Sequence, residues 1–463
     1  MAHAQQSLTL DSCRALALRN NKQIRMADEA VKGAGYAKKS AFAAYLPGID
    51  FTGGYMYNQH IIELLGEDAK LPTMSFNPST MQYEYNLVKG PDGVPVKNPA
   101  TGSYIPSEIA VIPKEAMSYD THNVFGGAFT LTQPIYMGGQ IRALNDMAKA
   151  GEAVAASARN AAVQDLLYSV DEAYWLVVSL REKQKLAEGF TALVDSLCYS
   201  VTKLQDNGMA TKSDLLNVQV KLNEAQIAQT KVTNGLALAK MALQQLCGLP
   251  IGDPLTLADE EKMQMPRMES LPTYSLQDVF RRRQDLEALR KSINLMEGKE
   301  KLSLSALLPK VAAVGTYAFS NPNVNHGFEK KFGGGFSVGA ALTIPIWHWG
   351  GNYYQYKAAK SATLSQRLLL EDMEEKVELQ VRQARYKFEE AYKTLEMTKT
   401  NMEKADENLR NAELGYKEGV LTVDDVTAAQ TAWLQAHSEE VDAEIGVRLC
   451  DVYLAKVLGL MPY

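Results

Sequence analysis

Apolar and polar residues alternate one by one in four short stretches of the chain. The stretches lie near residues 45–57, 123–135, 311–319 and 332–346, and in each the apolar or aromatic side chains occupy every second position. A period of two is typical of a β-strand with one apolar face, and the lengths indicate strands of about ten residues. Aromatic residues stand toward the strand ends, and small or polar residues fill the alternate positions.

A seven-residue repeat replaces this alternation in most of the remaining sequence. From Val377 to Tyr416, apolar side chains follow one another at steps of four and three, and only Thr398 interrupts them. Between Leu215 and Leu246 a similar stripe is interrupted only by Gln229. Because such stripes are the packing faces of helices, the pattern predicts long helices that pack as coiled coils.

Landmarks that recur at a constant spacing indicate an internal duplication. Three pairs stand 211 residues apart, namely Pro134 with Pro345, Gly208 with Gly419, and Gly248 with Gly459. A fourth pair, the Leu-Pro dipeptides that end at Pro47 and Pro309, stands 262 residues apart. The difference of 51 residues indicates an insertion in the first copy, within residues 56–121, which contain seven of the 17 prolines. So many prolines predict an irregular loop outside any core.

The duplication divides the chain into two structural repeats. We expect the first repeat to span 1–250, with a helix near 10–44, strands near 45–57 and 123–135, the insert 56–121 and a helical hairpin 141–247. A linker, 251–273, follows it. We expect the second repeat to span 274–463, with a helix near 276–307, strands near 311–319 and 332–346, and a helical hairpin 352–458. In each hairpin a helix of about 66 residues returns through one of about 36, so the separate helix of each repeat is expected to stack end to end with the shorter one.

The composition limits how this chain could cross a membrane. Hydrophobic residues make up 46% and charged residues 22% of the sequence, and no run approaches the roughly 18 to 20 consecutive apolar residues that a spanning helix needs. Alternating strands with aromatic ends are typical of transmembrane β-barrels, although the alternation alone also fits half-buried strands of a soluble sandwich. Four strands cannot enclose a lumen, and open sheet edges in hydrocarbon are costly, so a membrane protein of this kind must oligomerise. Three copies would supply about twelve strands.

Charge and candidate chemistry exclude several classes of function. The formal net charge is −6 and no basic block stands out, so nucleic acid is not an expected partner. The six histidines are scattered, and the cysteines Cys13, Cys198, Cys247 and Cys450 form no C-x-x-C pair, so neither a metal site nor a redox motif is indicated. Known catalytic and nucleotide-binding motifs are missing from the sequence, so we expect no enzyme, no catalytic residues and no cofactor.

Nearly the whole chain resembles the TolC-like outer membrane efflux proteins of Gram-negative bacteria. The likeness is carried by the duplication, the Leu-Pro strand starts, the Pro-Ile strand exits that lead to Gly-Gly, the glycines of the hairpin turns and the Gly-Leu-Pro ends. It implies an α+β membrane protein, a homotrimer whose four strands per chain form a 12-stranded β-barrel in outer membrane lipid, continued by a coiled-coil α-barrel in the periplasm. Residues 251–273 with the C-terminus would form an equatorial layer, and the insert 56–121 an enlarged extracellular loop.

The resemblance also implies a function and partners. Similar proteins are passive exit ducts of tripartite efflux pumps, docked to a periplasmic membrane-fusion adaptor and an inner-membrane pump of the RND or ABC type. Residues 1–6 resemble the end of a signal peptide, which agrees with export. Cys13 falls inside a predicted helix, so the lipid-anchoring N-terminal cysteine of some relatives is not expected. The same duct could instead serve type I protein or polysaccharide secretion, and a soluble periplasmic coiled-coil scaffold is the alternative from another class.

Individual residues can be compared with the family only at the two hairpin turns. The turns implied to engage the adaptor consist of Gly208, Met209, Ala210 and Thr211 in the first repeat and Gly419, Val420, Leu421 and Thr422 in the second. The second turn resembles the constricted end of the pore, where the gate would consist of Tyr416, Val420, Leu421, Val423, Asp424 and Asp425.

The two aspartates of this gate have two readings. Three copies of Asp424 and Asp425 would gather about six carboxylates, a ring that favours cations. Aspartates at this place equally suit the capping of a helix N-terminus. Leu421 and Ala428 stand where the family's gate has an arginine and a further aspartate. These two departures from the family pattern predict closure by apolar packing of Val420, Leu421 and Val423, in place of a salt bridge.

Overall fold

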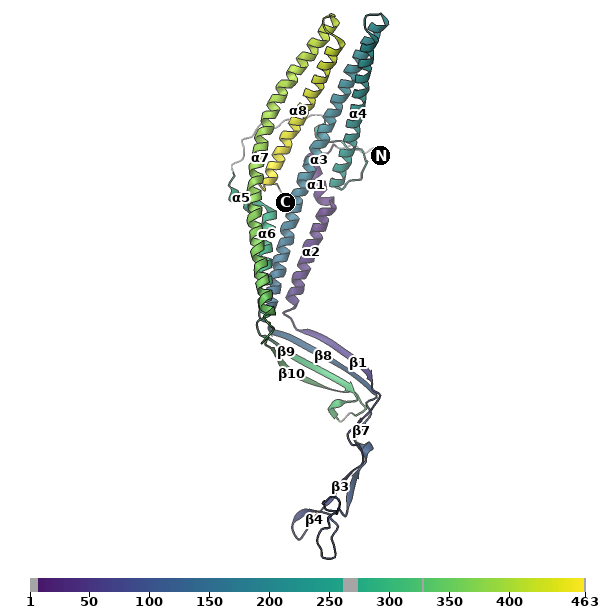
Figure 1. Cartoon of the computed structure of the whole chain (residues 1–463), viewed down its shortest axis with the longest axis vertical. Coiled ribbons are helices and arrows are strands. Elements are labelled where there is room, and N and C mark those ends of the chain that lie inside the picture. Colours follow the sequence, from purple (N-terminus) through teal and green to yellow (C-terminus); the bar gives the residue numbers. More distant parts are fainter. Residues whose placement is uncertain (1–6, 261–273, 327–328, 462–463) are drawn as a thin grey trace. The chain divides into compact units, whose positions relative to one another are not determined.

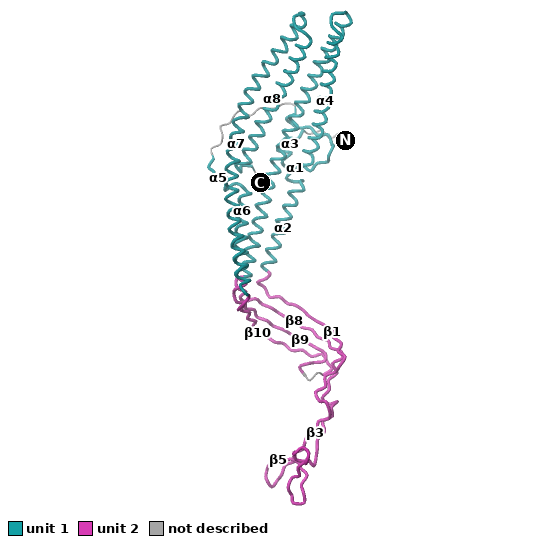
Figure 2. Tube along the Cα trace, in the orientation of Figure 1, with its two compact units in different colours: residues 1–42, 140–304, 349–463 teal, residues 43–139, 305–348 magenta. Residues whose placement is uncertain are grey.

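The structure, a computed structural model, describes residues 7–260, 274–326 and 329–461. The chain divides into a helical unit, residues 1–42, 140–304 and 349–463, and a unit of strands, residues 43–139 and 305–348 (Figure 2). The signal-peptide-like residues 1–6 and most of the predicted linker, 261–273, lie outside the described residues.

The helical unit is built from two long hairpins and two pairs of shorter helices (Figure 1). The helices are α1 Leu10–Asn20, α2 Lys22–Ala43, α3 Gln140–Asp206, α4 Lys212–Cys247, α5 Leu276–Arg282, α6 Gln284–Ser305, α7 Gly351–Lys417 and α8 Val423–Val457. The hairpins are α3 with α4 and α7 with α8. At 67 residues each, α3 and α7 are about 100 Å long. Among the described helices, none is apolar over a length that would cross a bilayer.

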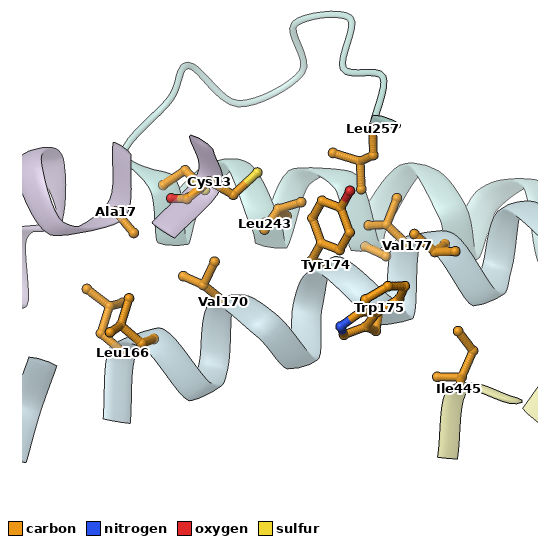
Figure 3. Packing of buried hydrophobic residues seen from close by; sticks show 14 of the residues in the cluster. Cys13, Ala17, Leu166, Val170, Tyr174, Trp175, Val177, Leu243, Leu257 and Ile445 are labelled. Atoms are coloured by element: carbon orange, nitrogen blue, oxygen red, sulfur yellow. The ribbon is translucent and has the colours of Figure 1, made fainter. Parts of the chain in front are cut away.

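The first hairpin packs on α1 around a buried apolar cluster. Cys13 and Ala17 of α1 lie against Val170 and Tyr174 of α3, with Leu243 of α4 beside them (Figure 3). All five side chains are at most 1% exposed. These positions lie one or two helical turns apart, so the packing follows the apolar stripes of the three helices.

An ion pair fastens α1 to α3 at the edge of this cluster. Arg14 donates from Nε to Asp171 Oδ1 at 2.7 Å and from Nη2 to Oδ2 at 2.5 Å. The Asp171 side chain is fully buried, whereas that of Arg14 is 30% exposed. The two-pronged geometry satisfies both oxygens of a carboxylate that has no access to water.

Each of the two helices that were predicted as continuous is broken once. The predicted helix 10–44 is interrupted at Asn21, where ψ is 130°, and the predicted helix 276–307 at Arg283, where ψ is 117°. Asn21 stabilises the first break, because its Oδ1 accepts from Gln23 N at 2.8 Å and its Nδ2 donates to Leu246 O at 3.0 Å. The breaks are 262 residues apart, the spacing of the Leu-Pro landmarks.

The strand unit contains one antiparallel sheet of four strands in the order β1-β8-β9-β10. The strands are β1 Gly48–Tyr57, β8 Asn123–Tyr136, β9 Lys310–Asn321 and β10 Gly333–Thr343. Strand β8 of the first repeat pairs with β9 of the second, which leaves β1 and β10 as the two edges.

The register gives this sheet one aromatic and one polar face. Phe51, Phe129, Tyr317 and Phe336 are direct neighbours across all four strands. One residue further along, Asp50, Thr130, Thr316 and Ser337 form a second row. Because successive side chains of a strand point to opposite faces, the two rows lie on opposite sides of the sheet.

The insert, predicted to be an irregular loop, is instead a chain of short antiparallel ladders. It contains β2 Ile62–Glu63 paired with β7 Ser118–Tyr119, β3 Ala69–Pro72 with β6 Ile109–Ile112, and β4 Met74–Asn77 with β5 Gln82–Tyr85. The prolines misled the prediction because a two-stranded ladder tolerates them. Each strand there is an edge on which outward N–H groups need no partner. Pro72 is the last residue of β3, and the other prolines lie in turns, isolated bridges and connections.

Candidate docking and gating site at the hairpin turns

The turns of the two hairpins have the same backbone geometry. In the first, Gly208 has φ +75°, and Met209 N donates to Leu204 O at 2.8 Å. In the second, Gly419 has φ +76°, and Val420 N donates to Gly415 O at 2.8 Å. Both form a Schellman motif, which places glycine in the left-handed conformation directly after a helix. The landmark glycines of the sequence thus end the two long helices.

A capping box begins the returning helix on the far side of each turn. Thr211 Oγ1 accepts from Asp214 N at 3.1 Å, and Asp214 Oδ2 accepts from Thr211 N at 2.9 Å. Thr422 and Asp425 make the same exchange at 3.3 and 2.8 Å. Such a box satisfies two backbone donors at a helix N-terminus.

These hydrogen bonds also stabilise the charged form of the capping aspartates. Bonds from the Thr211 backbone and side chain lower the pKa of Asp214 below its ordinary value. Bonds from the Thr422 side chain and backbone do the same for the pKa of Asp425. Hydrogen bonds to the charged form favour that form, so both carboxylates are ionised at neutral pH.

The neighbouring Asp424 is in a different situation. Within the described part of the chain, no hydrogen bond or ion pair engages its carboxylate, and the residue is exposed. The structure therefore separates the two predicted gate aspartates. Asp425 caps α8, and Asp424 presents a free carboxylate. In the described residues no basic side chain forms an ion pair with either one.

The apolar residues predicted to close the gate also differ from one another in exposure. Val420 is 78% exposed and Leu421 37%, whereas Val423 is buried between the hairpins. Val423 and Val426 of α8 pack with Val194 and Val201 of α3. Of the three apolar gate residues, Val420 and Leu421 can meet another molecule or another copy of the chain, and Val423 holds the two hairpins together.

A cavity of about 810 Å³ lies between the two hairpins beside their turns. Both turns contribute to its walls, through Met209 and Ala210 of the first and Gly419, Leu421 and Thr422 of the second. Two acidic and two basic residues also line it, namely Asp214, Glu413, Lys203 and Lys417. The structure thus brings most of the predicted docking residues to one site.

Two residues that line this cavity each contain a buried polar atom with no hydrogen-bond partner in the described structure. They are the hydroxyl of Tyr416 and Oε1 of Gln430, a residue only 2% exposed. Burial, and then the charge of Asp214, raises the pKa of Tyr416, so its hydroxyl stays protonated. A buried acceptor without a donor is costly unless another group supplies one. Gln430 was not predicted from the sequence. A signal was available, because it is a polar residue one turn beyond the apolar position Val426.

Comparisons with known proteins agree with the fold. A family model described as "Outer membrane efflux protein" matches residues 107–249 and 275–460. The CmeC outer membrane channel of Campylobacter jejuni superposes with a TM-score of 0.72 at 16% identity over 97% of this chain and 85% of that one. The outer membrane protein VceC of Vibrio cholerae gives 0.71 at 15% over 97% and 96%. The open MtrE outer membrane channel of Neisseria gonorrhoeae gives 0.72 at 17% over 97% and 88%. No curated protein sequence matches the chain. The predicted fold class is confirmed.

Proposed function

The chain belongs to the outer membrane efflux protein family, and from this premise we propose that three copies form the outer membrane duct of a tripartite efflux pump. It is a transport protein and not an enzyme. In the proposed assembly the strands lie in the outer membrane of a Gram-negative bacterium and the helices extend into the periplasm. The duct passively conducts small molecules that an inner-membrane pump of the RND or ABC type and a periplasmic adaptor deliver to it.

The observation that carries this proposal is the two-faced sheet with its two open edges. Side chains of the aromatic row are between 49 and 83% exposed in the single chain, Phe51 and Phe336 among them. An exposed aromatic face fits lipid, and the row from Asp50 to Ser337 fits a water-filled lumen. Pairing β10 of one copy with β1 of the next would remove both open edges. Because a soluble scaffold would leave the aromatic face in water, the sheet favours the duct.

The first test is the mass and conductance of the detergent-extracted protein. We expect light scattering to give a protein mass of about 153 kDa, three times 51.0 kDa. We also expect the same sample to open ion-conducting pores in planar bilayers. A monomer that is monodisperse without detergent and conducts nothing would overturn the proposal.

For the cavity between the hairpins we propose the adaptor as occupant. A hairpin turn of the adaptor would place an apolar side chain beside Leu421, and a donor of that turn would reach Gln430 Oε1 once the buried glutamine side chain turns toward the cavity. Both groups gain from such contact, because Leu421 is partly exposed and Gln430 Oε1 is an unpaired buried acceptor. The four charged residues that line the cavity would fix the register and orientation of the bound adaptor turn.

Bulky substitutions at the turns are expected to abolish docking without dissociating the trimer. A Cβ added at Gly208 or Gly419 would meet no atom within 4 Å, but leucine opposes the left-handed backbone, which costs about 1–2 kcal/mol. The turn is expected to change shape, and the yield of crosslinks to the adaptor to fall roughly tenfold or more. Gly139→Leu is the control, since its φ of +81° and open surroundings are similar but it lies at the other end of α3. Equal crosslinking in all three variants would refute the assignment.

For the gate we propose that Asp424 supplies the ring of carboxylates. Asp424→Asn would remove three charges from the trimer and leave the capping box of Asp425 intact. We expect block of single-channel current by divalent cations to weaken several-fold, because such a ring concentrates cations. Asp206→Asn, an exposed aspartate beside the other turn, is the control. If the two variants are blocked like the unmodified channel, Asp424 has no part in the gate.

A further inference from the structure

Two of the four cysteines meet at the junction of α1 and α4. Cys13 lies in α1 and Cys247 is the last residue of α4, 234 positions later. Both side chains are 0% exposed. The Cys247 thiol donates to the backbone carbonyl of Cys13 at 3.6 Å and is also hydrogen-bonded to the Cys13 thiol. Both sulfur atoms therefore occupy one small buried space.

The other two cysteines are apart from this pair and from each other. Cys198 lies in α3 toward the hairpin turn. Cys450 lies in α8, where its thiol donates to Lys387 O at 3.7 Å. At a rise of 1.5 Å per residue, Cys450 lies about 30 Å further from the turn of its hairpin than Cys198 lies from the turn of the other hairpin. They provide an internal control, since neither contacts a second thiol.

We propose that Cys13 and Cys247 form a disulfide that ties the N-terminal helix to the end of the first hairpin. The inference rests on the proposed export, because disulfides form and persist outside the reducing cytoplasm. Each thiol loses one proton and the pair loses two electrons as the S–S bond forms. A protein or small-molecule disulfide of that compartment accepts the electrons and two protons and is reduced to two thiols.

The surroundings determine when this bond can form. The hydrogen bond between the two thiols, with burial adding to the effect, raises the pKa of Cys247, and the same bond lowers the pKa of Cys13. Both side chains are 0% exposed, so an oxidant cannot reach either thiol in the folded chain. Oxidation therefore belongs to folding, when α1 docks and an oxidant still has access. Once formed, the buried bond resists reductants for the same reason.

The bond would complete a junction that other contacts already begin. Just before α1, Leu8 N donates to Thr256 O at 3.0 Å and Ala258 N donates to Leu8 O at 3.0 Å. The segment that follows α4 therefore returns to pair with the residues that precede α1. A covalent link from Cys13 to Cys247 would join α1 to the C-terminal end of α4 at this same place. Helix α1 could then not separate from α4 unless the C-terminal end of α4 unfolded.

Differential alkylation of the full chain tests the proposal. The protein is expressed in a host with an outer membrane, and the cells are lysed directly in denaturant with N-ethylmaleimide, so that buried free thiols are blocked as well. After reduction, a heavier maleimide labels the thiols released from disulfides. We expect Cys13 and Cys247 to carry the heavy label, and Cys198 and Cys450 the light one. Trypsin without reduction should yield one linked pair, the peptide that ends at Arg14 joined to the peptide that begins at Met241.

Two double variants sharpen the test. The Cys198→Ala, Cys450→Ala chain should keep the linked peptides and show no free thiol before reduction. The Cys13→Ala, Cys247→Ala chain should show two free thiols with or without reduction. Light label on Cys13 and Cys247 in protein recovered from the outer membrane would overturn the disulfide and leave the proposed function untouched.

A chain that does not reach the outer membrane would count against the proposed function. In that case the disulfide is tested with the purified chain, refolded in a mixture of reduced and oxidised glutathione. Preferential linkage of Cys13 to Cys247 would support the geometry, and any other pairing, or none, would overturn it.

Discussion

Replacing Arg14 with alanine is expected to weaken the attachment of α1 to α3 by about 3–5 kcal/mol, because it leaves the buried carboxylate of Asp171 without its partner. The loss should be large although Arg14 itself is 30% exposed. Both oxygens of Asp171 depend on this one guanidinium, at 2.7 and 2.5 Å. Hydrogen exchange of the α1 amides in the detergent-extracted protein measures the effect, since it reports the free energy of local opening.

A second ion pair between neighbouring helices provides the control. Arg159 of α3 donates to Asp28 of α2 at 3.0 Å, with the two side chains 34 and 45% exposed. Exposed pairs contribute about 0–1 kcal/mol, so Arg159→Ala should change the exchange of α2 little. Replacing both members of the buried pair, Arg14→Met with Asp171→Leu, should recover most of the loss because no charge is then stranded. Similar losses for Arg14→Ala and Arg159→Ala would contradict this account.

Alanine at Gly248 is expected to destabilise the end of α4 by about 2–5 kcal/mol. The residue has φ +67°, and a left-handed conformation costs an L-residue about 1–2 kcal/mol. An added Cβ would also stand 2.6 Å from the Cβ of Asn20 and 3.2 Å from its backbone C and O. Crowding of a tightly packed place adds about 1–3 kcal/mol. Thermal and denaturant unfolding of the purified protein, together with hydrogen exchange around α1, measures the sum.

Gly208→Ala separates the two contributions. Gly208 has φ +75° in the same Schellman geometry, but its added Cβ would meet no atom within 4 Å. Gly208→Ala should therefore lose only the free energy that the left-handed backbone costs an alanine. The difference in stability between the two variants then measures the collision with Asn20. In the second repeat, Gly459→Ala should behave like Gly248→Ala, because its Cβ would stand 2.9 Å from the Cβ of Arg282. If Gly208→Ala and Gly248→Ala lose the same amount, the contact with Asn20 carries no energy.

These glycines also show where prediction from the sequence succeeds and where it ends. Strands and long helices were predictable because each has its own hydrophobic period. The breaks at Asn21 and Arg283 were not, because helical propensity and the apolar pattern continue across them. Their cause is tertiary. The end of α4 contacts the chain beside Asn21, and Gly459 likewise contacts Arg282, next to Arg283. A single sequence shows that a landmark recurs but not which distant segment it touches.

The candidate site was predictable to a similar extent. The turn residues follow from the repeat, since a glycine between two apolar stripes ends one helix and a threonine with an aspartate three residues later begins the next. That spacing singles out Asp425, three residues after Thr422, as the capping aspartate, whereas the free carboxylate of Asp424 required coordinates. Gln430 stands one helical turn beyond the apolar Val426, which hinted at its burial, but its lack of a hydrogen-bond partner could be seen only in the structure.

The pairing of β8 with β9 has a consequence for the origin of the assembly. This junction joins the second strand of one repeat to the first strand of the next. In a ring of three chains, β10 and the neighbour's β1 would meet in the same relation. The ring would then contain six nearly equivalent units, joined alternately by covalent junctions within a chain and non-covalent junctions between chains. This arrangement is expected if six copies of a half-length ancestor once closed the ring and later fused in pairs. Only the first unit of each pair carries the 56–121 insert, so the insert alone would reduce a sixfold plan to a threefold one.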